Sequence, residues 1–267
     1  MSSVIDISLS HLLLFSAFLL VPAYLLYRWQ LIELSKSTLI SVVRMTAQLM
    51  LVGLYLKYLF ELNHLWLNIA WLLVMITVAN ISIVKGAGLR LARFFWVTQV
   101  SLMTAIITVC LMFLLILVQP EPFLDARYLI PIAGMLLGNC LQGNIRALET
   151  FYTDLRREEA NYHSDLLLGA TVSEAVQPFF RRAVRTSMTP IVGTMATLGI
   201  VSLPGMMTGQ ILGGALPLIA AKYQIAIMVA IYLSMICAIS LNLRLSLRSA
   251  FTASGLLRED IFLTEAD

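Results

Sequence analysis

Residues 95–118 read FWVTQVSLMTAIITVCLMFLLILV and contain no charged side chain. An α-helix rises about 1.5 Å per residue, so roughly 20 apolar residues span the hydrocarbon core of a bilayer. The run is continuous, not alternating, which argues against a membrane-spanning β-strand, because lipid leaves each backbone polar group to be paired in its own helix or in a closed barrel. This stretch therefore predicts a transmembrane helix.

The rest of the chain has the same apolar character. Of its 267 residues, 60% are hydrophobic and 12% are charged, whereas soluble domains carry about 45–50% apolar and about 25% charged residues. This composition argues against a soluble fold. We expect an all-α, polytopic integral membrane protein with about seven transmembrane helices. The apolar runs predict these helices at about 8–27, 38–60, 65–84, 95–118, 128–146, 188–206 and 217–241.

The distribution of Lys and Arg predicts the orientation, since cytoplasmic loops carry an excess of both. With the C-terminus inside, the outer segments keep only Lys57, Arg127 and Lys222. We therefore expect the N-terminus outside and the C-terminus in the cytoplasm. Residues 1–9 carry no basic side chain, so the first apolar run is expected to be a retained helix and not a secretory signal. The chain is then one transmembrane domain, 1–267, with a cytoplasmic loop at about 147–187 and a cytoplasmic tail at about 242–267.

The long cytoplasmic loop contains an amphipathic helix pattern. Thr171 and Glu174 have the S/T-x-x-E spacing of a capping box, so a helix should begin there. Beyond this cap, apolar residues recur every three or four positions and the basic residues take the other face. Pro178 lies inside the pattern and should kink the helix or divide it into two short pieces. This surface either docks a partner or lies on the bilayer with its arginines at anionic headgroups.

Two apolar stretches carry helix-breaking residues: 130–139, which reads IPIAGMLLGN, and 202–214, which reads SLPGMMTGQILGG. Discontinuous helices persist in membranes only where protein or a water-filled cavity satisfies the freed backbone groups. We predict that both line a translocation path; the alternative is ordinary helix packing through paired glycines. Arg44 in the second span is either a path residue or a side chain that reaches the headgroups. The predicted path residues are Arg44, Gln48, Pro131, Gly134, Gly138, Asn139, Ser202, Pro204, Gly205, Met206, Met207, Gly209 and Gln210.

Several kinds of chemistry have no sequence signature. The expected spans hold no interior Asp or Glu, so a proton relay is not predicted. We predict no resident metal site; Met206 and Met207 are either contacts for a soft cation or core filler. The chain has no phosphate-binding loop of the G-x-x-x-x-G-K-S/T type and no catalytic constellation, so we expect a non-enzymatic protein that binds no cofactor itself. Nucleic acid is not an expected partner.

Three segments carry a family resemblance: IPIAGM at 130–135 followed by GN at 138–139, LGAT at 168–171, and VSLPGMM at 201–207 followed by KYQI at 222–225. In order, spacing and length of chain, they closely resemble the FetB family of ABC-transporter permeases. The resemblance implies an iron exporter in the bacterial cytoplasmic (inner) membrane. It also implies a permease homodimer paired with two copies of a cytoplasmic FetA-type ATPase, which binds the ATP and Mg. Plant relatives are linked to aluminium tolerance.

In ABC permeases a cytoplasmic coupling helix fits a cleft of the ATPase, and the LGAT segment resembles the start of that element. The gap from Gly169 to Pro190 is longer than in the usual importer motif, so register does not assign the contacts. The predicted coupling residues are Gly169, Ala170, Thr171, Glu174, Arg181, Arg182 and Arg185. The alternatives are a secondary transporter or channel without a motor, and a membrane scaffold protein without flux.

Overall fold

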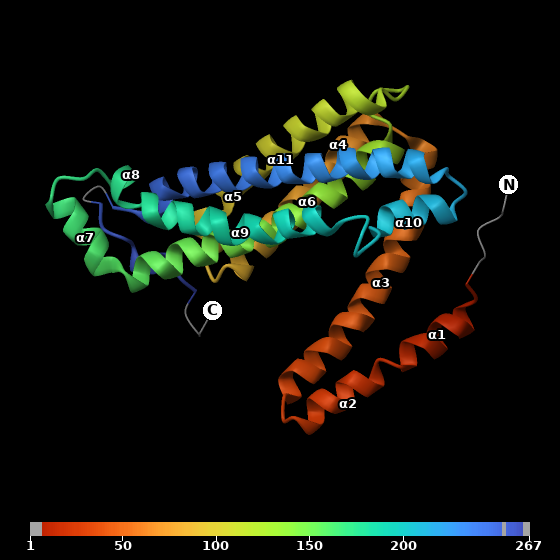
Figure 1. Cartoon of the computed structure of the whole chain (residues 1–267), viewed down its shortest axis with the longest axis horizontal. Coiled ribbons are helices and arrows are strands. Elements are labelled where there is room, and N and C mark those ends of the chain that lie inside the picture. Colours follow the sequence, from red (N-terminus) through yellow and green to blue (C-terminus); the bar gives the residue numbers. More distant parts are fainter. Residues whose placement is uncertain (1–6, 253–254, 264–267) are drawn as a thin grey trace.

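The computed structural model describes residues 7–252 and 255–263, and within them all regular elements are helical. Figure 1 shows a bundle of long helices from which an N-terminal arm projects. The α-helices are α1 (Leu9–Ala17), α2 (Leu20–Arg28), α3 (Ile32–Leu62), α4 (Leu65–Gly86), α5 (Leu91–Phe113), α6 (Ala126–Arg157), α7 (Glu159–Leu167), α8 (Val172–Ala175), α9 (Gln177–Thr197), α10 (Gly205–Leu212) and α11 (Pro217–Ala250). A π-helical turn, η1 (Leu114–Val118), ends α5, and a 3-10 turn, η2 (Glu259–Ile261), lies in the tail.

The bundle consists of α4, α5, α6, α9 and α11, with α5, α6 and α11 in mutual contact. On α5 the buried residues Phe94, Leu102, Ile106 and Phe113 recur at helical spacing, so one face of the helix enters the core. The same apolar core continues through α6 and α11 to Phe251. Close packing of these faces joins the five helices in one core.

The arm consists of α1, α2 and α3. Ser35 on α3 donates a hydrogen bond to the Ala23 carbonyl oxygen on α2 over 2.9 Å, which joins the two helices. The arm meets the bundle near the C-terminal end of α3, where Leu59 packs with Ala126 and Ile130 of α6. Elsewhere α3 stands away from the bundle (Figure 1). The arm is therefore anchored at one end.

The expected number of seven spans is not confirmed. In the described part of the chain five helical stretches are long and apolar enough to cross a membrane: Leu9–Arg28, Ile32–Leu62, Leu65–Gly86, Leu91–Val118 and Pro217–Ala250. The expected span 128–146 lies inside α6, and the expected span 188–206 covers the end of α9, a break and the start of α10. The expected orientation stays a prediction, and residues 1–6 and 264–267 lie outside the described residues.

The break expected at 130–139 is wrong, because α6 is continuous from Ala126 to Arg157 and has Pro131 inside it. Pro131 lies close to the start of α6, where the missing N–H removes one intrahelical hydrogen bond without ending the helix. The stretch expected as a cytoplasmic loop, 147–187, is mostly helical, since α6 extends into it and α7, α8 and α9 follow.

The division expected near Pro178 is confirmed. The helix divides at Val176, and Pro178 occupies the first turn of α9, where its missing N–H needs no partner. The expectation of two short pieces is half wrong, because α8 has 4 residues but α9 has 21. Both expected faces form: Phe179 and Ala183 are buried, whereas Arg181 and Arg185 are exposed.

Candidate functional site

A true helix break separates α9 from α10. α9 ends at Thr197, and Gly199 follows with a φ of 82°, a conformation that side chains other than glycine rarely adopt. The Gly199 N–H donates to the Ser202 carbonyl oxygen over 2.9 Å, and Pro204 forms the N-cap of α10. A second break at Gly214, with a φ of 92°, precedes α11. The discontinuity predicted at 202–214 is therefore confirmed.

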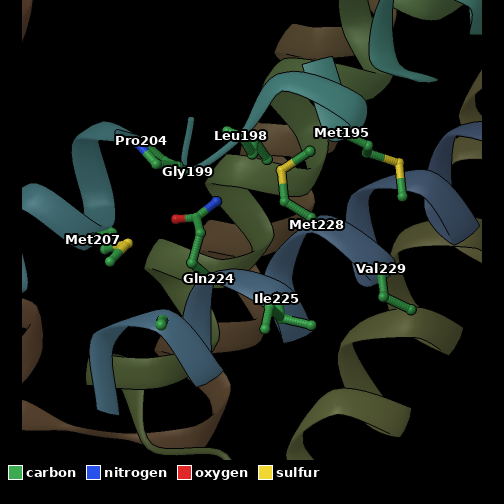
Figure 2. Close-up of a pocket in the computed structure, with 10 residues that line it drawn as sticks. Met195, Leu198, Gly199, Pro204, Met207, Gln224, Ile225, Met228 and Val229 are labelled. Atoms are coloured by element: carbon green, nitrogen blue, oxygen red, sulfur yellow. The ribbon is translucent and has the colours of Figure 1, made fainter. Parts of the chain in front are cut away.

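This break borders a cavity of about 390 Å³ between α9, α10 and α11. Figure 2 shows the amide of Gln224 pointing into this cavity, between Met207 and Met228. Gln224 is only 8% exposed, and its Oε1 accepts no hydrogen bond from the described residues. The lining residues are Met195, Leu198, Gly199, Pro204, Met207, Ala221, Gln224, Ile225, Met228 and Val229.

The wall of this cavity is uncharged. It offers three thioethers, which are soft ligands, and one amide. An isolated ion in so apolar a setting costs tens of kcal/mol by simple solvation arguments, unless it is paired or neutralised. Among the described residues no group of three or more His, Cys, Asp or Glu side chains could hold a metal ion.

A second cavity, of about 630 Å³, lies between the arm and the bundle. Gln48 of α3 and Gly138 of α6 both line it, with Trp71 and Met75 of α4. Its wall is mostly apolar. The structure thus brings together two predicted path residues that lie far apart in the sequence.

The remaining predicted path residues lie at separate places in the structure. Gln210 on α10 has a buried Oε1 that, like that of Gln224, accepts no hydrogen bond within the part of the chain that the structure describes. Asn139 donates back to the Met135 carbonyl oxygen of its own helix over 2.9 Å, and Arg44 is exposed on α3. Residues that line neither cavity are Arg44, Pro131, Gly134, Asn139, Ser202, Gly205, Met206, Gly209 and Gln210. The structure therefore does not gather the predicted path into one site.

The turn between α7 and α8 forms the far end of the bundle from α10 (Figure 1). The predicted capping box is present: the Glu174 N–H donates to Thr171 Oγ1 over 3.4 Å, and the Thr171 N–H donates to Glu174 Oε2 over 2.9 Å. The Thr171 hydroxyl also donates to Glu174 Oε2 over 2.7 Å. The two hydrogen bonds that the carboxylate accepts lower the pKa of Glu174, and the one from the hydroxyl contributes most. Gly169 has a φ of 96°, and the side chains of Leu167 and Leu168 before it are 89% and 85% exposed. The turn presents two apolar side chains beyond a fixed helix start.

The three predicted coupling arginines have different surroundings. Arg182 donates to Asp154 Oδ2 over 3.0 Å and to Glu158 Oε1 over 2.8 Å, so it locks α9 to the end of α6. The hydrogen bond that Glu158 accepts from Arg182 lowers the pKa of Glu158, and the hydrogen bonds that Arg182 donates to Glu158 and Asp154 raise the pKa of Arg182. Arg181 and Arg185 stay exposed.

A sequence profile of the uncharacterised protein family UPF0014 matches residues 9–251. The chain belongs to the UPF0014 family. It is 34% identical to the UPF0014 membrane protein slr1647 of Synechocystis over 81% of this chain and 83% of that protein. It is 35% identical to the Arabidopsis thaliana protein ALUMINUM SENSITIVE 3 over 74% and 71%, and 33% identical to the probable iron export permease protein FetB of Escherichia coli over 78% and 79%. No solved structure matches it significantly.

The bundle of this UPF0014 chain contains buried amides that sequence reasoning missed. Asn242 on α11 donates to Asn144 Oδ1 on α6 over 3.1 Å and accepts from Thr98 Oγ1 on α5 at 3.1 Å. Asn80 on α4 donates to Gln99 Oε1 on α5 over 2.9 Å. Each of these amides is a polar residue inside an apolar run, which is a sign of a buried hydrogen bond, but the sequence alone does not reveal which helix supplies the hydrogen-bond partner. Gln224 is also a polar residue inside an apolar run.

Proposed function

We propose that this UPF0014 chain is the membrane-spanning permease subunit of an ABC transporter that exports iron, driven by ATP hydrolysed on a separate cytoplasmic FetA-type ATPase. The E. coli relative, named as a probable iron export permease, supports the cargo. The absence of a phosphate-binding loop from the sequence supports a separate motor. ATP and Mg are then bound by the ATPase.

One observation carries the mechanical part of the proposal: α9 is a single helix that joins the two candidate regions. It begins at Gln177, two residues after α8, and ends at Thr197, where the break and its cavity begin. A helix of 21 residues is about 30 Å long. A displacement of the α7–α8 turn therefore moves the wall of the cavity, as rigid elements transmit motion in transporters.

In this proposal the α7–α8 turn lies in the cytoplasm of a bacterium and docks on the ATPase. Exposed Leu167 and Leu168 supply an apolar contact, Gly169 and Ala170 form the turn, and the Thr171–Glu174 box fixes its direction. Arg181 and Arg185 supply exposed positive charge. Two copies of the permease, with the N-terminus of each outside, enclose the path in the inner membrane.

Co-purification with a FetA-type ATPase tests the partnership. We expect the ATPase to remain bound to the wild-type chain and to lose most of its binding to a Leu167→Asp, Leu168→Asp double variant. Glu61→Ala, an exposed position near the end of α3, is the surface control and should bind normally. Normal binding by the double variant contradicts docking at this turn.

Coupling is tested at Glu174. Glu174→Ala removes half of the capping box, and we expect substrate-linked ATP hydrolysis to fall severalfold in an assembled complex. Iron efflux by a strain without any ATPase would instead support a motor-independent transporter, and retention of the ATPase without efflux would support a scaffold.

The break itself is tested by Pro204→Ala and Gly205→Leu. Either change favours continuation of the helix, so we expect loss of efflux with normal insertion into the membrane. Pro22→Ala in the arm is the control. Full efflux by both variants removes the break from the mechanism.

A further inference from the structure

The Gln224 amide has an unmet hydrogen-bond requirement inside the cavity of α9, α10 and α11. The side chain is more than nine-tenths buried, and Oε1 accepts no hydrogen bond from the described chain. It extends into the space between Met207 and Met228 (Figure 2). Buried carbonyl oxygens are nearly always paired, so an occupant that brings an N–H or O–H donor would satisfy this oxygen once the amide rotates to bring it to the cavity surface.

The cavity has no charge with which to receive an ion. Its lining residues are apolar or neutral, and Gln224 is the only one with a polar side chain other than the thioethers of Met195, Met207 and Met228. A hydrated iron cation would exchange its water for sulfur ligands that suit softer metals, in a wall with no carboxylate to balance its charge. A bare cation is therefore a poor occupant.

The dimensions of the cavity also suit a molecule better than an ion. About 390 Å³ lies within the range of small-molecule sites, which are mostly apolar and carry a few placed polar groups. Methionine side chains adapt to irregular shapes, so three of them can close around an occupant.

From these observations we propose that the cavity takes its cargo as an electroneutral small molecule or metal chelate that donates a hydrogen bond to Gln224. This inference rests on the proposed permease function and specifies the chemical class of its cargo. Neutralisation occurs before binding, because the chelating groups, and not the protein, complete the coordination of the metal.

Equilibrium dialysis of the purified permease, without ATPase, tests the proposal. The probe is radiolabelled ferric tris(acetohydroxamate), which is uncharged and carries N–H donors; aquo iron(II) is the comparison. We expect the chelate to bind the wild-type chain at least tenfold more tightly than the aquo ion. We expect Gln224→Leu to weaken chelate binding about tenfold, as loss of one buried hydrogen bond predicts.

Gln142→Leu is the matched control, because Gln142 is an exposed glutamine of α6 that lines neither cavity, and it should bind as the wild type does. Met207→Phe, which fills part of the cavity and leaves Gln224 in place, tests the site if Gln224→Leu does not fold. The proposal is overturned if the folded wild type does not bind the chelate, if aquo iron(II) binds equally well, or if the folded cavity variants retain full binding. Because no ATPase is present in this assay, a negative result would overturn the proposed cargo class without deciding whether the ATPase docks at the α7–α8 turn or is coupled through it.

Discussion

Helix α11 of the bundle and helices α1 to α3 of the N-terminal arm are similarly apolar, yet they bury very different shares of their residues. Half of the most apolar window of α11 is buried, compared with 6% for the stretch formed by α1 and α2 and none for α3. Polar side chains of the bundle also join helices that are far apart in the sequence, as Asn242 on α11 does with Asn144 on α6. In the arm Ser35 bonds to the neighbouring helix α2, and Thr46 donates to a carbonyl oxygen of its own helix.

This difference separates what the chain determines alone from what its surroundings determine. The bundle helices are positioned by a shared core and by hydrogen bonds between helices. The exposed apolar faces of α3 have no partner within the described chain away from its C-terminal part, so lipid or a second copy must cover them. Large effects on stability should therefore come from the bundle.

The largest expected effect is that of Asn242→Leu. The change leaves Asn144 Oδ1 without a donor and the Thr98 hydroxyl without an acceptor, both in buried positions. Buried unsatisfied groups cost about 1–3 kcal/mol, and hydrogen bonds between membrane helices are at the lower end. Because two groups lose their partners, we expect a loss of about 2 kcal/mol, measured by denaturation of the purified protein in mixed detergent micelles.

Gln48→Leu is the matched control in the arm. Gln48 is exposed on α3 and lines the cavity that faces the bundle, so the more apolar side chain should leave the free energy of unfolding nearly unchanged. Equal destabilisation by both variants would mean that side-chain contacts stabilise the arm as strongly as they stabilise the bundle.

The next effect in size concerns the anchor between the two regions. The Tyr55 and Trp71 rings have centroids 4.2 Å apart, and Tyr55 packs beside the small cluster of Leu59, Ala126 and Ile130. Tyr55→Ala removes this contact, at a cost of about 1.5 kcal/mol. We expect faster hydrogen exchange in α3 with unchanged exchange in α11, and equal acceleration in both would contradict independent stability of the bundle.

The contrast also explains how much the sequence could predict. Apolar length predicts the membrane helices, since spanning lipid is a property of a single segment. The capping box at Thr171 and the division near Pro178 were predictable for the same reason: each depends on neighbouring residues. The continuity of α6 through Pro131 was not, because a proline near a helix start permits either outcome.

The candidate site was only partly predictable. The break at 198–204 follows from Gly199 and Pro204, which act locally. Other features depend on which helices become neighbours in space. These are the unpartnered oxygen of Gln224 and the hydrogen bond between Asn144 and Asn242, which are 98 positions apart in the sequence. Arg182 shows the same limit, since its acidic partners lie on α6 and just after it, beyond the reach of helix-face reasoning.

A smaller effect distinguishes the turn between α7 and α8 from the turn between α9 and α10. Gly169 and Gly199 both have positive φ, and at neither does another part of the chain lie within 4 Å of the place that a methyl group would take. Gly→Ala therefore costs about 1 kcal/mol of backbone energy at either position. We expect Gly199→Ala to slow iron efflux while ATPase binding persists, and Gly169→Ala to weaken ATPase binding. Pull-down of the purified complex and efflux from vesicles measure the two outcomes, and the same defect in both variants would show that the two turns do not have separate roles.

The smallest expected effect belongs to the tail, whose described residues contact the start of α5. Asp260 accepts a hydrogen bond from Arg93 Nη2, and this interaction lowers the pKa of Asp260 below its ordinary value. In the same region the backbone N–H of Arg90 donates to the Ile261 carbonyl oxygen over 2.8 Å. The ion pair should therefore help to hold the tail across the start of α5.

The sign of the pH dependence follows from the lowered pKa. The stabilisation is complete above the pKa of Asp260 in the unfolded chain, about 3.9, and disappears as the pH falls through the lower native value. Asp260→Asn should remove it at every pH. Because both partners are nearly half exposed, we expect a small shift in the melting temperature at pH 7 that vanishes in strong acid, where the wild type becomes equivalent to the variant. A shift that persists unchanged below about pH 3 would assign the tail contact to the packing of Ile261 and not to the ion pair.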